Sequence, residues 1–432
     1  MSTIEISSDV LTESFERTAG GLARTYRVGD ETYTSDVTTE RSTGDDRGDW
    51  WQAFLDGAVP VSRQYRGQLR TLDLFCGPGG LALGFGQAAR ELGYSVVSEA
   101  ALDGDEGAHR VYRSNHETRT AATAAIGSAI IDYQVRGVAE KAKFRYDPEI
   151  LDERFAHLPG SVDVVLAGPP CQGHSNLNNH TRRSDRRNEL YLAVPAFAVA
   201  IDAEMVIIEN VPAVIHDRGQ VVDSTINLLR TAGYEVSTGR FFADRMGWPQ
   251  TRQRFFLLAR KGKTPLDPAL VQSALNEPEP RPIWWAIGEL EHAEVDGLMV
   301  PPIELSDENR RRIQWLFDND AHDLALSERP ECHQDGTTYN SVYGRLYLDR
   351  PAPTITSGFM TPGRGRYIHP TQRRTLSPRE AARLQGFPDT YRFHPDESEP
   401  SSKAQLGKWI GDAVPMPLGH GAGLAVLAAR GL

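Results

Sequence analysis

The chain has 432 residues and a formal net charge of −11, with 47 Lys and Arg side chains against 58 Asp and Glu. This acidity excludes a protein that binds polyanions over its whole surface. Three cysteines, Cys76, Cys171 and Cys332, are too few for a disulfide framework and indicate a reducing compartment. The N-terminus lacks the pattern of a signal peptide, and no apolar run reaches the roughly 18 residues of a membrane span. We therefore expect a soluble intracellular protein of roughly two to three domains.

The acidic charge is concentrated in parts of the chain. Residues 261–345 hold 8 basic and 16 acidic side chains, whereas residues 346–432 hold 11 and 7. A short polar stretch adds four arginines. Such basic clusters are usually solvated faces, but they also fit a surface that faces phosphates. The four arginines are Arg182, Arg183, Arg186 and Arg187.

The predicted elements change character along the chain. Residues 25–34, with Gly29-Asp30 at the centre, could form a hairpin in an N-terminal region without catalytic motifs. From residue 69 onward, short apolar runs alternate with helical stretches, which predicts a doubly wound α/β sheet with ligands beyond the carboxyl ends of its strands. Residues 262–350 lose this rhythm and suggest a second, less regular domain. The apolar runs are 72–75, 96–102, 162–167, 205–208 and 255–259.

A glycine-rich turn follows the first of these runs. Residues 73–80 read Asp-Leu-Phe-Cys-Gly-Pro-Gly-Gly, and glycines directly after a strand let the backbone approach a ligand closely. The spacing differs from the dinucleotide fingerprint. Asp103 ends the next strand, where a carboxylate can accept hydrogen bonds from a ribose diol. The two features favour an adenosine-containing cofactor over a plain turn with a surface aspartate.

Three further features also lie at strand ends. Prolines in residues 168–175, Gly-Pro-Pro-Cys-Gln-Gly-His-Ser, hold Cys171 outside a strand, where positive surroundings would favour a nucleophilic thiolate over a buried structural cysteine. Glu209 emerges from an apolar strand, and burial there would keep its carboxyl protonated, unless it only caps a helix or forms a salt bridge. Arg252 and Arg254 would lie on one side of an extended segment and hold a carbonyl or phosphates, unless this is only an exposed edge strand.

In this order, the four features resemble the motifs of the DNA (cytosine-5-)-methyltransferase family. Two more similar segments follow at 376–389 and 410–418, so the resemblance covers residues 69–432. It implies a Rossmann-like methyltransferase sheet and a smaller target-recognition domain. The implied domains are an N-terminal extension at 1–65, partly disordered or partner-binding; a catalytic and cofactor-binding domain at 66–261; a target-recognition domain at 262–395; and a C-terminal segment at 396–432 that returns to the catalytic domain.

The resemblance also implies the chemistry. A methyl group from S-adenosylmethionine would reach C5 of a cytosine flipped out of a specific sequence in double-stranded DNA, leaving S-adenosylhomocysteine. Cys171 would attack C6, Glu209 would bond N3, and Arg254 would hold O2 with Arg252 in support. The implied cofactor residues are Phe75, Gly77, Gly79, Gly80, Leu81, Asp103, Pro170, Leu190, Asp412 and Ala413. The implied DNA-binding residues are Ser175, Arg182, Arg183, Arg186, Arg187 and Thr354.

Two residues depart from the family pattern. His174 stands where the family commonly has Phe, and Asp412 stands where it usually has Asn. The acid that bonds the adenine amino group is not identified in the sequence. Two alternatives stay open: the same chemistry on RNA, and a catalytically silent DNA-binding scaffold.

The expected setting is a restriction-modification or phage-defence system in the prokaryotic cytoplasm, with the protein at the nucleoid when it is bound to DNA. We expect a monomer without a metal, and the N-terminal extension could bind a partner protein.

Overall fold

The computed structural model describes residues 11–123, 129–170, 190–292, 305–331, 334, 341–396 and 398–431. The chain divides into two compact units: unit 1 is Met1–Phe242, Gln253–Asn276 and Val414–Leu432, and unit 2 is Ala243–Arg252 and Glu277–Ala413. The division expected from the sequence cut the chain near 65, 261 and 395 instead. Contacts extend unit 1 past 261 because helix α6 (Pro268–Ala274) packs on strand β14 (Tyr234–Phe242), and helix α11 (Met416–Leu427) packs on helix α2 (Gly80–Glu91).

Unit 1 is built on a seven-stranded sheet in the order β14-β15-β13-β12-β5-β6-β7. Strands β13, β12, β5, β6 and β7 pair in parallel, whereas β15 runs antiparallel to both β13 and β14. The predicted α/β sheet is confirmed, with one reversed strand. The other strands are β5 (Gly67–Leu74), β6 (Tyr94–Asp103), β7 (Thr118–Thr123), β12 (Val164–Ala167), β13 (Met205–Asn210) and β15 (Gln253–Lys261).

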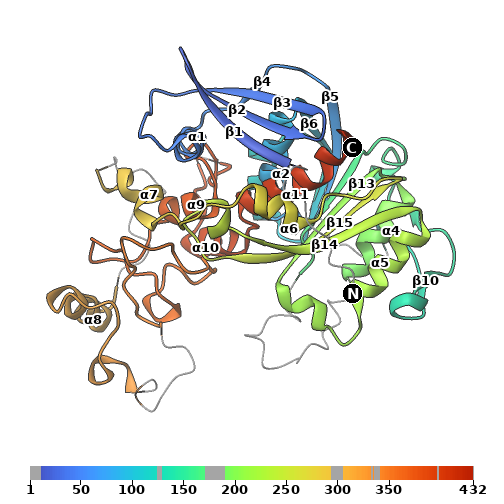
Figure 1. Cartoon of the computed structure of the whole chain (residues 1–432). Coiled ribbons are helices and arrows are strands. Elements are labelled where there is room, and N and C mark those ends of the chain that lie inside the picture. Colours follow the sequence, from blue (N-terminus) through green and yellow to red (C-terminus); the bar gives the residue numbers. More distant parts are fainter. Residues whose placement is uncertain are drawn as a thin grey trace, which may run out of the picture. The chain divides into compact units, whose positions relative to one another are not determined.

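Helices cover both faces of this sheet (Figure 1). Apolar residues of α4 (Ala193–Ala200) and α5 (Val221–Thr231) share one core cluster with alternate residues of the central strands, such as Val165 and Ala167. Helices α2, α6 and α11 pack on the sheet from the other side. A Cβ on Gly84 of α2 would lie 2.3 Å from the Met416 carbonyl oxygen, so the α2–α11 contact requires glycine there. Helix α3 (Glu106–Asn115) lies beside β6 and β7.

Four short strands of unit 1 form two separate ladders. They are β8 (Ile131–Asp132), which pairs with β11 (Glu149–Ile150), and β9 (Val135–Arg136), which pairs with β10 (Lys143–Phe144).

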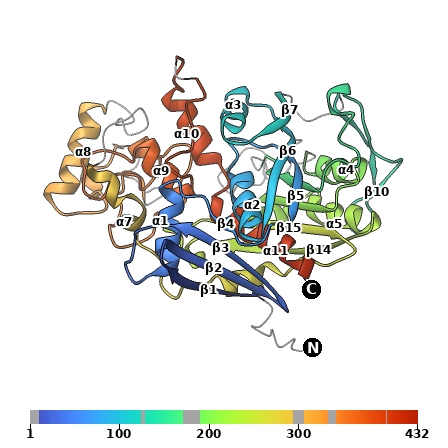
Figure 2. The same cartoon turned by 90° about the horizontal axis from the view of Figure 1, so that it is seen from above.

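The N-terminal region of unit 1 is folded from residue 11 onward. Strands β1 (Leu11–Thr18), β2 (Gly21–Val28), β3 (Glu31–Thr38) and β4 (Val61–Ser62) form an antiparallel sheet, with helix α1 (Asp46–Leu55) between β3 and β4 in sequence (Figure 2). Strands β2 and β3 are joined through Gly29 and Asp30, which confirms the predicted hairpin. Strands β3 and β4 contact α2, so residues 11–62 belong to the same packed body as the large sheet.

A buried charge network joins the N-terminal sheet to α2. Glu91, the last residue of α2, is fully buried and accepts hydrogen bonds from Arg24 of β2 at 3.0 Å and from the indole of Trp50 at 3.2 Å. Nε2 of His420 on α11 lies 2.7 Å from the same carboxylate. Arg24 also pairs with Glu13 of β1 at 2.5 Å. Because buried charges are costly unless they are paired, these contacts tie α2 to residues far away in the sequence.

Unit 2 holds short helices and isolated bridges. Its α-helices are α7 (Ile283–Ile287), α8 (Asp307–Asp318), α9 (Pro378–Gln385) and α10 (Lys403–Asp412). Outside the strands, residue pairs such as Gln250 and Ala352 form single bridges. Leu316 of α8 forms a small apolar cluster with residues outside the helix, among them Ile368. In the described ranges of both units, every helix is too short or too polar to cross a membrane.

The pH dependence of stability should report on Glu91. Burial alone would raise its pKa, but the charges of Arg24 and His420 outweigh this effect and hold the pKa at about 2, below the usual value of 4.5. A lowered pKa contributes stability above pH 4.5 that is lost as the pH falls towards 2. Glu91→Gln should therefore lose about 3–5 kcal/mol of unfolding free energy at pH 7, and its stability should fall less steeply across that acidic window.

Denaturant titrations between pH 7 and pH 2.5 would measure this difference. Glu16 is an exposed acid of β1 and gives the matched control Glu16→Gln, which should change stability by at most about 0.5 kcal/mol. Equal losses in the two variants would contradict the role of the network.

Candidate functional site

The carboxyl ends of four neighbouring strands lie at the same edge of the sheet in unit 1. The register aligns Ala167 of β12 with Leu74 of β5 on one side and with Ile208 of β13 on the other. Leu74 in turn aligns with Leu102 of β6. Four of the segments identified in the sequence continue one residue beyond this level, at Phe75, Gly168, Glu209 and Asp103. The arginine feature lies instead at the start of β15. The predicted convergence of these strand ends is confirmed.

The glycine-rich turn after β5 has an unusual backbone. Phe75 adopts a positive φ of 57°, which is rare for a residue with a side chain and is typical of functional turns. Gly77 has a φ of 53°, and a Cβ placed on it would meet no heavy atom within 4 Å. Gly79, in the left-handed region, precedes α2, which begins at Gly80. The turn thus exposes backbone at the strand end, and a ligand can approach it closely.

Asp103 organises this turn. One carboxylate oxygen accepts a hydrogen bond from the Gly77 amide, and the other accepts one from the Asp105 amide, both at 2.8 Å. A carboxylate offers about four acceptor positions, so these bonds leave room for the diol expected from the sequence. Asp103 therefore shapes the turn as well as presenting an acceptor.

A second carboxyl group lies buried beside the turn. Asp73 is 1% exposed, and burial together with the nearby Asp103 charge raises its pKa well above the usual range. Burial and the same two acids raise the pKa of the Cys76 thiol. Cys76 thus stays a thiol at neutral pH. The burial of Asp73 was not predicted from the sequence, although Asp73 lies inside an apolar run whereas Asp103 ends one.

The start of α2 suits an anionic group. Its first turn contains no acidic residue, and Gly79 supplies no capping side chain, so the first backbone amides point beyond the helix. Leu81, in the same turn, is buried. Together with the open space at Gly77, this arrangement fits a cofactor that carries a carboxylate and an adenosine.

Glu209 and Arg254 form an ion pair at the same edge of the sheet. Nε of Arg254 donates to Oε1 of Glu209 at 2.8 Å, and their side chains are only 15% and 10% exposed. Because β15 is antiparallel to β13, its first residues lie beside the last residues of β13, where Asn210 aligns with Phe255. The reversed strand is thus what brings an arginine to the glutamate.

The ion pair fixes the orientation of the Glu209 side chain. A Cβ on Gly168 would lie 3.8 Å from Oε2 of Glu209 and 3.7 Å from the Phe75 carbonyl oxygen. Arg254 therefore bonds one carboxyl oxygen while the other is directed towards the segment that leads to Cys171.

Asn210 fixes that segment and was not singled out in the sequence. Its side-chain amide donates to the Pro169 carbonyl oxygen at 3.2 Å, and its own oxygen accepts from the Val211 amide at 2.8 Å. Asn210 is 1% exposed. Pro170 follows and is half-buried. The other predicted residues of this motif and of the arginine stretch lie outside the described residues: Cys171, His174, Ser175, Arg182, Arg183, Arg186 and Arg187.

Arg252 differs from Arg254 in its surroundings. The prediction that both lie on one side of an extended segment is wrong, because the Arg252 amide donates to the Gln250 carbonyl oxygen in a tight turn and β15 begins only at Gln253. In unit 2, the buried Arg252 guanidinium donates to the carbonyl oxygens of three residues. They are Ile355 at 2.6 Å, Gly411 at 3.2 Å and Ala413 at 3.0 Å.

The remaining predicted residues have varied environments. Leu190 of unit 1 is half-buried. In unit 2, Ala413 is buried, whereas Asp412 is exposed and lies 3.5 Å from Nζ of Lys408. Thr354 is half-buried, with its hydroxyl 3.5 Å from the Thr251 carbonyl oxygen.

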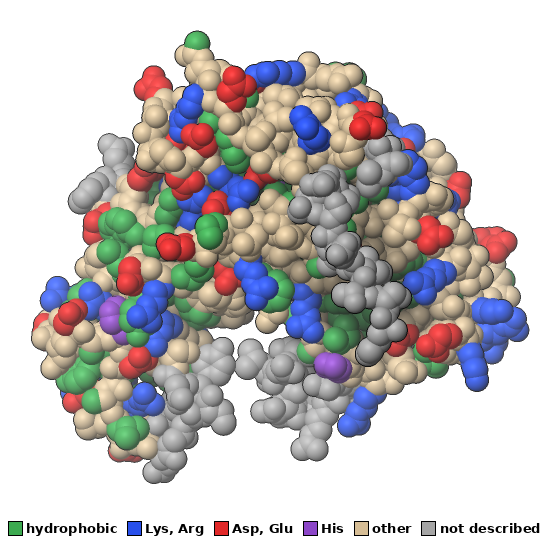
Figure 3. All heavy atoms as spheres, viewed as in Figure 1, with side chains coloured by type: hydrophobic (Ala, Val, Ile, Leu, Met, Phe, Trp, Pro, Cys, Tyr) green, Lys and Arg blue, Asp and Glu red, His purple; other side chains and the backbone are tan. Residues whose placement is uncertain are grey.

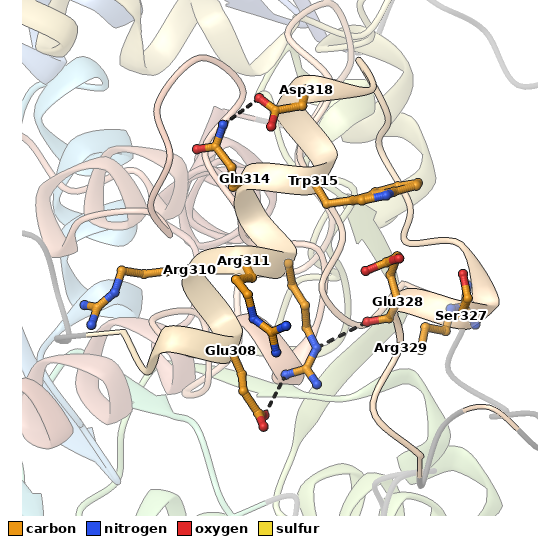
Figure 4. A pocket seen from close by; sticks show the side chains of 10 residues that line it. Glu308, Arg310, Arg311, Gln314, Trp315, Asp318, Ser327, Glu328 and Arg329 are labelled. Carbon is orange, nitrogen blue, oxygen red and sulfur yellow. Dashed lines mark hydrogen bonds and ion pairs between the residues drawn. The ribbon is translucent and has the colours of Figure 1, made fainter.

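Unit 2 has a pocket of about 650 Å³ beside α8 (Figure 4). Its charged side chains are partly paired: Arg312 with Glu308 at 3.4 Å, and Arg310 with Asp307 at 2.7 Å. The half-buried Trp315 also lines it. The mixture of arginines, acids and an aromatic ring suits a polar ligand with flat groups.

On the face shown in Figure 3, basic and acidic side chains are interspersed over the described surface. The acidic excess of the sequence is thus not gathered into a single patch on this face.

Comparisons with known proteins agree with this geometry. The model of the family "C-5 cytosine-specific DNA methylase" matches residues 69–425. The chain is 38% identical to the Type II methyltransferase M1.BsuMI of Bacillus subtilis, over 81% of this chain and 78% of that protein. It is 32% identical to the Type II methylase M.HgiDII of Herpetosiphon aurantiacus, over 81% and 92%. The solved structure of the Dnmt2 methyltransferase of S. pombe has a similar fold, with a TM-score of 0.54, 17% identity, and 84% of this chain and 99% of that chain covered.

The hydrogen bonds of Asp103 can be tested without any ligand. Asp103→Asn keeps one carboxamide oxygen but replaces the other by a donor, so one of the two amides loses its acceptor. We expect hydrogen exchange at the amides of Gly77 or Asp105 to quicken by about tenfold, since one hydrogen bond to a charged group contributes roughly 1.5–3 kcal/mol. Unchanged exchange at both amides would show that the turn keeps its shape without Asp103.

Proposed function

This chain belongs to the family of C-5 cytosine-specific DNA methylases, and we propose that it methylates C5 of a flipped cytosine in a specific duplex DNA sequence. S-adenosylmethionine, when bound, supplies the methyl group. The observation that carries the proposal is the Glu209–Arg254 ion pair beside Gly168, at the same sheet edge as the glycine-rich turn. This arrangement places an acid and a cation where the Cys171 segment begins.

The residues act on the cytosine in sequence. The Cys171 thiolate adds to C6 and forms a covalent bond, which pushes electron density into the ring towards N3 and C5. Glu209, when it carries a proton, donates to N3, and Arg254 holds O2 and fixes the glutamate. After C5 has gained the methyl group, a water molecule takes the C5 proton. The electrons of the C5–H bond then form the double bond between C5 and C6, and Cys171 leaves C6 as the thiolate, which restores the aromatic ring. The target cytosine can react only after it has left the stacked bases of the duplex, which requires base flipping.

The residues at the glycine-rich turn fit the cofactor. Gly77 leaves open space beside the backbone, Asp103 presents acceptors for the ribose, and the start of α2 suits the methionine carboxylate. Phe75 would contact the adenine. The remaining residues proposed for this pocket are Gly79, Gly80, Leu81, Pro170, Leu190, Asp412 and Ala413.

Contacts with DNA come from few side chains in this proposal. Arg182, Arg183, Arg186, Arg187 and Ser175 would contact the backbone or the target, and Thr354 would bond a phosphate. The α8 pocket of unit 2, with Trp315, suits contacts to bases. The names of the relatives favour a role as the modification enzyme of a restriction-modification system. Three further parts of the proposal are a partner protein bound through the N-terminal extension at residues 1–65, action as a monomer, and a role in phage defence.

The substitution Cys171→Ser tests the covalent step. We expect labelled methyl transfer from S-adenosylmethionine to duplex DNA by the wild type, and none by the variant, because a hydroxyl is a far weaker nucleophile than a thiolate. Duplex containing 5-fluorocytosine should trap the wild type as a denaturant-stable adduct, since C5 then has no proton to lose. Transfer by Cys171→Ser would overturn the nucleophile assignment; transfer to RNA only, or to neither polymer, would favour the alternative substrate or a silent scaffold.

The substitution Glu209→Gln tests the acid. It should lower kcat by about 10²-fold while DNA affinity changes little, because the amide can bond N3 but cannot supply a proton. The chain offers a matched control in Glu204, which pairs with Arg260 at the same 2.8 Å distance at the far end of the β13–β15 ladder. Glu204→Gln should keep its kcat. Equal losses of kcat in the two variants would point to a structural effect. The modified sequence itself can be identified by bisulfite sequencing of the product DNA.

A further inference from the structure

Unit 2 contains a buried polar cluster that the proposed reaction does not use directly. Gln250 and Gln385 are fully buried and Arg252 is 3% exposed. All three side chains donate to backbone carbonyl oxygens of segments that are distant in the sequence. Such buried donors are costly to desolvate unless their partners are well placed, so the cluster fixes the segments that it joins.

Arg252 connects two of these segments. One is residues 353–356, Pro-Thr-Ile-Thr, where Arg252 donates to the Ile355 carbonyl oxygen at 2.6 Å. The other is the turn at 411–413 after α10, where it donates to the carbonyl oxygens of Gly411 at 3.2 Å and Ala413 at 3.0 Å. The guanidinium group makes these bonds from two nitrogen atoms, Nη1 and Nη2, which are held apart in one plane. A lysine ammonium group also has three donors, but they all lie on one nitrogen atom at the end of a flexible chain.

The glutamines complete the connection. Oε1 of Gln250 accepts from the Ile355 amide at 3.2 Å, and its amide donates to the Leu384 carbonyl oxygen at 2.7 Å. The amide of Gln385 donates to the Ile410 carbonyl oxygen at 2.6 Å. Both segments are therefore held by side chains and not by a strand ladder.

The two segments also lie against each other without intervening side chains. A Cβ on Gly411 would be 2.2 Å from the Ser357 amide nitrogen and 2.3 Å from the Thr356 carbonyl carbon, both backbone atoms. Only glycine fits there. A displacement of either segment consequently moves the other, because no flexible side chain separates their backbones.

We propose that Arg252 is a positioning residue that couples DNA binding at Thr354 to cofactor binding at Asp412 and Ala413. This inference rests on the proposed function of the two segments. Arg252 does not hold the cytosine; it holds the backbone of both segments. When the cofactor orders the 411–413 turn, the 353–356 segment becomes ordered as well. When DNA orders the 353–356 segment, the 411–413 turn becomes ordered in the same way. By linkage, the cofactor must then tighten DNA binding by the same factor as DNA tightens cofactor binding.

The test is the coupling factor between S-adenosylhomocysteine and duplex carrying the sequence found by bisulfite sequencing. We expect S-adenosylhomocysteine to tighten DNA binding by the wild type by at least about fivefold. Arg252→Lys should reduce this factor to nearly one, since the single nitrogen of lysine cannot replace two nitrogens held apart in one rigid plane. The matched control is Arg281→Lys, a buried arginine of the same unit that pairs with Glu277 at 3.0 Å and should leave the factor unchanged.

A second measurement needs no variant. Adding S-adenosylhomocysteine to the wild type should slow hydrogen exchange at amides in residues 353–357 as well as at 411–413. A wild type without coupling, an Arg252→Lys variant with the full factor, or protection confined to 411–413 would each overturn the inference. These results are distinct from failure of the proposed function, in which the wild type transfers no methyl group to DNA.

Discussion

The direction of a single strand determines what the candidate site can contain. In a wholly parallel sheet, only residues that follow strands reach the edge where ligands bind. Strand β15 runs the other way, so a residue that starts a strand, Arg254, meets one that ends a strand, Glu209. Neighbouring parallel strands then bring the glycine-rich turn, Asp103 and the Pro-Pro segment to the same level. The order and direction of the strands thus determine the positions of Glu209, Arg254 and the glycine-rich turn.

In unit 2, the backbone segments are held in position by a different kind of interaction. In the residues that the structure describes, it has single bridges in place of strand ladders, and buried side-chain donors hold its backbone. Arg252 and Gln385 bond carbonyl groups there, much as neighbouring strands do in a sheet. Glu380 at the start of α9 is another buried polar residue of this unit. Burial opposes its ionisation, but Arg374 and His369 hold its pKa at about 2. Irregular backbone is thereby kept in one conformation at the cost of buried polar groups.

The sequence predicted five of the seven strands of the large sheet and the residues at their ends, because apolar runs followed by polar residues look alike in every parallel α/β sheet. Strands β7 and β14 were not among the predicted apolar runs. The sequence could not give the direction of β15, since the apolar pattern of residues 255–259 is the same whichever way the strand runs. It misplaced Arg252, because the two-residue period holds only where the chain is extended and residues 250–252 form a tight turn. The network around Glu91 was also beyond it, as Arg24 lies 67 residues away and nothing local marks either charge as buried.

That network has an evolutionary consequence. The family match begins at residue 69, so Glu91 belongs to the shared part of the fold. Arg24, in the N-terminal sheet, and Trp50, in helix α1 between β3 and β4, both bond Glu91 and both precede the match. In a relative without this sheet, an acid at the position of Glu91 would lose two of its donors and become costly to bury. The acid and the sheet should consequently be gained and lost together among homologues. Among homologues, the joint presence of the acid and the sheet would identify the proteins in which residues equivalent to 11–62 are part of the packed core.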